Sequence, residues 1–130
     1  MFGPCPCPRP LSRILVTLAL AAGSTSAAGA WQYVIGEERA DQQANLCESE
    51  TAVAEIATIF RKFSPRTGYS ALADSKECAM SVESFVPRRV VDEIVVAEGK
   101  PGEYRIRFVE VTLADGAVRY LVTTRNVIEP

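Results

Sequence analysis

Residues 103–127 read EYRIRFVEVTLADGAVRYLVTTRNV, and this stretch decides the fold class. Apolar and polar residues alternate before and after Ala114-Asp115-Gly116. An Asp-Gly pair between two alternating runs is typical of a tight β-hairpin turn. We therefore expect two antiparallel strands, over residues 103–113 and 118–127.

Along the first of these strands, the apolar side chains switch from one face of the strand to the other. Tyr104, Ile106 and Phe108 share one face, whereas Val109 and Val111 lie on the other, because side chains alternate along a strand with a period of two. Either a β-bulge near Phe108 brings both sets to one face, or both faces are covered. We favour the bulge, because a single helix cannot cover both faces of a sheet.

Further strands are expected upstream of this hairpin. Residues 80–86 alternate in polarity, residues 90–97 are rich in β-branched side chains, and Pro87 separates the two runs. Residues 98–102 contain two glycines and form the next hairpin loop. Together with the first hairpin, these segments predict an antiparallel β-meander of three to five strands.

A long helix is expected before the sheet. Residues 37–63 contain no Gly or Pro, and helix-forming residues dominate. Apolar side chains recur there at multiples of three and four, namely Leu46, Val53, Ile56, Phe60 and Phe63. Ser64-Pro65 ends the helix, and residues 64–79 are expected to be a loop. Residues 31–35 form either a first short strand or a docked arm.

The predicted fold is therefore α+β, with one long amphipathic N-terminal helix packed on the antiparallel β-meander. The order of strand, helix and meander resembles, in outline, the fold of the cystatin family. The inhibitory loop of that family has the pattern Gln-x-Val-x-Gly, and the nearest stretch here, residues 94–99, contains no Gln. The resemblance implies an arrangement of elements and not the inhibitory motif.

The first thirty residues have the features of a signal peptide. Arg9 and Arg13 precede an apolar run over residues 14–22, and Ala28-Gly29-Ala30 supplies the small-x-small pattern of a cleavage site. The run is shorter than the about 20 apolar residues that span a bilayer. We expect residues 1–30 to be cleaved, leaving one domain, residues 31–130, that is periplasmic or secreted and has no membrane anchor. An uncleaved anchor or a disordered tail is the alternative.

Cysteine usage agrees with export. Cys47 and Cys78 are the two cysteines of residues 31–130, and in an oxidising compartment they are expected to form a disulfide. Free buried thiols and a catalytic thiol are the alternatives. Cys5 and Cys7 lie in the expected signal peptide, and two thiolates provide only half of a metal site. We therefore expect no metal ion and no cofactor.

Composition excludes several classes of protein. The chain contains no histidine, which rules out a Ser-His-Asp triad, a Cys-His pair and a His-containing zinc site within it. The chain has 14 basic and 16 acidic residues, and its first thirty residues hold two of the basic ones and no acid. Residues 31–130 therefore carry 12 basic and 16 acidic side chains, a net charge of −4. Nucleic acid is not an expected partner of an acidic domain.

Several side chains are candidates for contact with a partner. Arg105 and Arg107 should project from the strand face opposite Tyr104, and with Arg119 across from them they would form a basic patch for carboxylates or phosphates. Cross-strand pairing with acids such as Glu93 is the simpler interpretation. Trp31 and Tyr33, at the new N-terminus, are either binding anchors or part of the core, and the core is favoured.

These features predict a small exported, non-enzymatic protein that binds another protein. Inhibition of an extracytoplasmic hydrolase is one concrete version. The alternative is a carrier of a small apolar ligand, with a pocket between the helix and the sheet. An enzyme that uses carboxylates alone is the least favoured, because no spacing of acids selects a catalytic pair.

Overall fold

The computed structural model describes residues 31–130, so the expected signal peptide, Cys5 and Cys7 lie outside the described residues. Residues 32–130 form one compact unit. No helix of the described part is long and apolar enough to cross a membrane.

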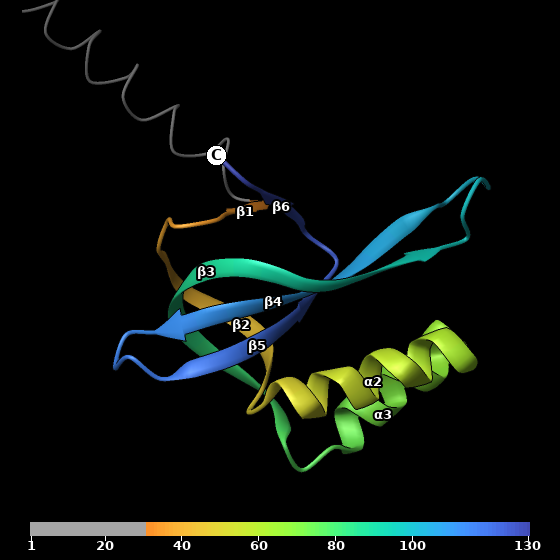
Figure 1. Cartoon of the computed structure of the whole chain (residues 1–130), viewed down its shortest axis with the longest axis horizontal. Coiled ribbons are helices and arrows are strands. Elements are labelled where there is room, and N and C mark those ends of the chain that lie inside the picture. The colour runs from red at the N-terminus through yellow and green to blue at the C-terminus, as the bar shows by residue number, and fades with distance from the viewer. Residues whose placement is uncertain (1–30) are drawn as a thin grey trace, which may run out of the picture. The chain divides into compact units, whose positions relative to one another are not determined.

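The described chain is α+β, with two helices and an antiparallel four-stranded sheet, as Figure 1 shows. The elements in chain order are β1 (Gln32–Val34), β2 (Arg39–Cys47), α2 (Glu50–Lys62), α3 (Pro65–Asp74), β3 (Cys78–Val96), β4 (Tyr104–Leu113), β5 (Val118–Thr123) and β6 (Asn126–Ile128). The prediction of an α+β fold with an antiparallel meander is confirmed.

The four central strands close into a small barrel in the order β2-β3-β4-β5. The closure is narrow, because β2 pairs with β5 only over Asn45–Cys47. β1 and β6 form a separate parallel pair that holds the two ends of the domain together, with Tyr33 opposite Val127. Beyond the barrel, the ribbon of β3 and β4 continues past the other strands (Figure 1).

The prediction of one long helix from residue 37 is wrong. The first part of that segment is β2, in which Ala44 and Leu46 are buried with a strand period of two. The helix α2 starts only after Ser49, whose side chain accepts a hydrogen bond from the backbone N–H of Ala52. The absence of Gly and Pro permitted a helix throughout, but pairing of β2 with two neighbouring strands overrode that local preference.

The predicted loop over residues 64–79 contains a second helix, α3. Ser64 caps this helix by accepting from the backbone N–H of Thr67, and Pro65 occupies its first turn. Ser-Pro therefore both ends α2 and starts α3, since proline is well suited to the first helical position. The amphipathic face of α3 buries Gly68 and Leu72.

Pro87 does not divide the strand around it. β3 runs without interruption from Cys78 to Val96. Pro87 lies two residues past Phe85, the last residue that pairs with β2, so no ladder hydrogen bond to β2 is lost there. The register with β4 shifts between Pro87 and Arg89 and again between Val90 and Asp92. The extra residues therefore lie on β3, and the second bulge is directly opposite Phe108 and Val109, where we had favoured a bulge on β4 itself.

Both faces of β4 are covered, which explains its change of parity. Ile106 and Phe108 pack in a cluster with the buried face of α2, whereas Val109 and Val111 pack in a second cluster with Leu121 of β5. The closed sheet encloses the second cluster, and the helices cover the first. Since the barrel supplies its own interior, one layer of helices is enough.

The two helices approach closely at Gly68. A Cβ added at Gly68 would lie 2.3 Å from Cδ1 of Phe60. The Phe60 ring is itself fixed between Tyr69 and Phe108, with ring centroids 5.0 Å and 6.2 Å away. No room remains for a larger residue, although alanine has the higher helix propensity.

The substitution Gly68→Ala is expected to lower the free energy of unfolding by about 1–3 kcal/mol, because the added methyl group must displace a packed ring. Urea denaturation followed by circular dichroism measures the change. Ser70→Ala, at an exposed position of the same helix, is the matched control and should change stability by no more than about 0.5 kcal/mol. Equal stability of the Gly68→Ala variant and the wild type would show that the helices are not packed as described.

Candidate functional site

The predicted disulfide is present and has a structural position. Cys47 ends β2, Cys78 begins β3, and the two residues are direct partners in the ladder between these strands. Both are buried in the core cluster under α2. The bond closes the segment that carries both helices, so α2 and α3 are held at a common base, and neither thiol is available as a nucleophile.

Ion pairs hold α2 on the sheet at both of its ends. At the N-terminal end, Arg89 lies 2.9 Å from Glu50 of the helix and 2.9 Å from Glu110 of β4. At the C-terminal end, Arg61 donates two hydrogen bonds to Asp92, at 2.8 Å and 2.6 Å. The signs of Glu50 and Arg61 match the helix dipole. The guanidinium of Arg61 lowers the pKa of Asp92, mainly through these hydrogen bonds.

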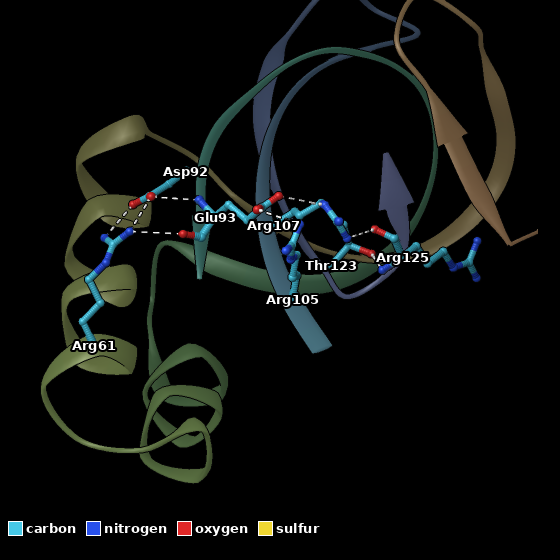
Figure 2. Close-up of polar contacts among 7 residues, drawn as sticks. All are labelled: Arg61, Asp92, Glu93, Arg105, Arg107, Thr123 and Arg125. Atoms are coloured by element: carbon cyan, nitrogen blue, oxygen red, sulfur yellow. Dashed lines mark hydrogen bonds and ion pairs between the residues drawn. The ribbon is translucent and has the colours of Figure 1, made fainter. Parts of the chain in front are cut away.

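The row of charges continues from α2 across the sheet, as Figure 2 shows. Glu93 accepts a hydrogen bond from Nε of Arg107 at 3.1 Å and lies 3.6 Å from the guanidinium of Arg105. Arg107 also donates to the backbone carbonyl of Arg125. The structure thus brings Arg105 and Arg107 together in cross-strand ion pairs with one shared acid.

Arg119 lies apart from this pair. Its partner in β4 is Val111, whereas the partner of Arg107 is Thr123, so the two arginines occupy different levels of the sheet. The guanidinium of Arg119 donates to the backbone carbonyl of Val118. The side chains of the three arginines lie on the same face of the sheet, but the register does not place Arg119 opposite Arg105 or Arg107.

Tyr33 and Trp31 have different environments. Tyr33 is 2 % exposed and packs in the barrel core, with its ring 5.6 Å from that of Phe85. The guanidinium groups of Arg39 and Arg125 each lie 5.2 Å from the centre of the Tyr33 ring. Trp31 is 76 % exposed. The favoured prediction placed both side chains in the core, and the structure agrees for Tyr33 but not for Trp31.

The described residues form a groove along β2, and the sequence did not reveal it. The groove consists of two adjoining cavities of 320 Å³ and 200 Å³ that share Asn45, Tyr69 and Met80 in their walls. The larger cavity is further lined by Leu72, Ala73, Cys78 and Ala79. The smaller one is further lined by Tyr33, Gln43, Ala44 and the residues 121–125. We call this surface the β2 groove.

The β2 groove is apolar at one end and polar at the other. Met80 is 54 % exposed and Tyr69 37 %, so large apolar side chains meet solvent at the end next to α3. The other end is lined by Gln43, Thr123, Thr124 and Arg125. Partial burial raises the pKa of Tyr69, with a smaller contribution from Tyr104, so its hydroxyl group is a hydrogen-bond donor at neutral pH. In the sequence, Met80 and Val82 share the more apolar parity of residues 80–86, so only the register with β2 shows that Met80 faces outward.

The space between helix and sheet is filled, and this bears on the carrier alternative. The carrier alternative places Val53, Ile56 and Phe60 of α2 opposite Tyr104, Ile106 and Phe108 across a pocket. Tyr104 is 38 % exposed, whereas the other five side chains are at most 5 % exposed and belong to one core cluster. The rings of Phe60 and Phe108 meet edge to face. These residues therefore act as core and leave the β2 groove as the surface of interest.

Comparison with protein-family models, with curated proteins and with solved structures finds no match to this chain. The function is therefore argued from the chemistry of its own residues.

The ion pair between Arg61 and Asp92 predicts a pH dependence of stability. Because the pKa of Asp92 is lowered in the folded state, the pair contributes stability above the ordinary value of 3.8, and this contribution is lost as the pH falls further. The substitution Asp92→Asn should destabilise the protein at about pH 7 by no more than about 1 kcal/mol, since the pair is partly exposed, and the loss should shrink at about pH 3.

Urea denaturation at the two pH values measures this difference. Glu55→Gln, on the exposed side of the same helix, is the control for loss of a carboxylate. A destabilisation by Asp92→Asn that is equal at both pH values would contradict the assigned role of the ion pair.

Proposed function

We propose that the chain is a small exported, non-enzymatic protein that binds another protein through the β2 groove. The observation that carries this proposal is that two exposed large apolar side chains, Tyr69 and Met80, line both cavities of one groove. Exposed apolar side chains that gather beside a groove are typical of interaction sites. Inhibition of an extracytoplasmic hydrolase remains one concrete form of such binding.

The groove is built on rigid elements. Cys78, held by the disulfide, lies in its wall, and Asn45 belongs to the three-residue closure of the barrel. Tyr69 is held against Phe60 by the tight contact of α3 with α2. A preformed surface loses little conformational entropy on binding, which favours affinity for a partner.

Two further features support binding over catalysis. Glu50, Asp92, Glu93 and Glu110 are engaged in ion pairs with arginines. The pKa of Asp92 is lowered by the guanidinium of Arg61, whereas a general acid at neutral pH needs a raised one. The alternative function, a carrier of a small apolar ligand, has less support because its expected pocket is packed core.

Export is supported by the basic and apolar segments of residues 1–30 and by the disulfide, which persists in oxidising compartments. The protein recovered from its native host is expected to have the mass of residues 31–130. Its thiols should react with an alkylating reagent only after reduction, as intact-mass spectrometry would show. A full-length mass with freely reactive thiols would contradict export.

Binding is tested by site-specific photo-crosslinking in the native host. Benzoylphenylalanine at position 69 or 80 is expected to give the same discrete protein adduct, and the same residue at Thr58, on the exposed side of α2, should not. The identified partner, once purified, should bind the Met80→Glu variant about tenfold or more weakly than the wild type.

The matched control is Val118→Glu, which introduces the same charge at an exposed apolar strand position outside the groove. It should leave the affinity unchanged. If positions 69 and 80 yield no adduct, or if both variants bind the partner as the wild type does, the proposed function is wrong.

A further inference from the structure

We infer that the β2 groove takes up an extended segment of the partner protein that carries an apolar side chain and, a few residues away, an acidic one. This inference rests on the proposed function and specifies the chemistry of what is bound. It is carried by the spacing of two carboxamides, the polarity of the two ends of the groove and its charge.

The floor of the groove is matched to an extended chain. Gln43 and Asn45 are alternate residues of β2, so their side chains leave the same face of the sheet about 6.5–7 Å apart. Two residues of an extended peptide have the same repeat. Each carboxamide offers both a donor and an acceptor and can therefore pair with a peptide group of the bound segment. A helix, which rises about 3 Å over two residues, does not match this spacing.

The apolar end of the groove selects an apolar side chain. Leu72, Ala73 and Met80 line the larger cavity, and the Tyr69 ring forms part of its wall. Asn45 also lines this cavity, so a segment whose backbone pairs with its carboxamide would place a neighbouring side chain there. Met80 and Asn45 are opposite each other in the ladder between β2 and β3, which keeps the two groups at the same level.

The charge of the groove favours an acidic residue at its other end. Arg125 is the only charged residue among those that line the two cavities, although residues 31–130 carry a net charge of −4. Its guanidinium is oriented by the Tyr33 ring and by a hydrogen bond to Gln42 Oε1 at 3.1 Å. Arg39 lies at the same ring and adds a second positive charge beside the groove. A carboxylate of the bound segment would meet these charges, and guanidinium–carboxylate hydrogen bonds are among the stronger ones.

The polar end of the groove is also open along β2. Pairing of β2 with β5 stops at Asn45, and the residues before it pair with β3 alone. β5 ends at Thr123, one residue past the last of these pairs, and the residues 121–125 line the smaller cavity. Before Asn45 no described strand pairs with β2 on that side, so a bound segment can extend along this part of β2.

The experiment is a selection from a phage-displayed library of linear random dodecapeptides on the protein purified from a host that expresses the full-length gene. Enriched peptides are expected to share an apolar residue and an Asp or Glu about two to four positions apart, in one constant order. In titrations with the synthetic peptide, Met80→Glu and Arg125→Gln should each weaken binding about tenfold. Val118→Glu and Arg66→Gln are the matched controls and should bind the peptide as the wild type does.

A peptide variant separates the charge contact from a loss of structure. When the acidic residue of the peptide is replaced by its amide, the wild type should bind more weakly, and Arg125→Gln should cause little further loss. Enrichment of basic peptides, no enrichment, or equal binding by Met80→Glu would overturn the inference. So would reversible dimerisation in analytical ultracentrifugation that Met80→Glu abolishes, since a second copy would then occupy the groove.

The two proposals fail in different ways. If crosslinking from positions 69 and 80 identifies a partner but the selection fails, the groove binds a folded surface, and only the extended segment is wrong. If peptides bind in the groove but no native adduct forms, the proposed function is wrong although the groove has the inferred chemistry.

Discussion

The structure depends on how the chain is held at Cys47. This residue pairs with Cys78 of β3 on one side and with Tyr120 of β5 on the other, and the disulfide joins the first of these pairs covalently. Closure of the barrel, the start of α2 after Ser49 and the return of the chain from α3 all occur next to it. Without this junction, the helices would have no fixed base on the sheet.

The same junction creates the surface that we assign to binding. Because β2 and β5 pair over only three residues, the part of β2 before Asn45 has no strand partner on the β5 side, and Gln43 and Ala44 of this part line the β2 groove. The packing of Gly68 against Phe60 brings Tyr69 to its edge. The β2 groove thus depends on two structural features, the short pairing of β2 with β5 and the close contact of α2 with α3.

Electrostatic interactions have a supporting role in this architecture. Arg89 and Arg61 hold the two ends of α2 on the sheet, and Glu93 gathers Arg105 and Arg107 between the strands. All of these pairs are partly exposed, so each contributes little by itself. Their arrangement leaves the lining of the β2 groove without a carboxylate, which is the basis for the inferred preference for an acidic segment.

The sequence by itself determined what depends on local pattern and on chemistry. Alternation around Asp115-Gly116 predicted the β4–β5 hairpin, the two cysteines of residues 31–130 predicted the disulfide, and the absence of histidine excluded whole classes of catalysis. Tertiary structure alone decided that residues 39–47 form a strand and that both faces of β4 are covered. The β2 groove likewise could not be predicted from the sequence pattern of neighbouring residues. Its walls come from α3, β2, β3 and β5, and pairing between segments distant in sequence is worth more free energy than the helix propensity of any one of them.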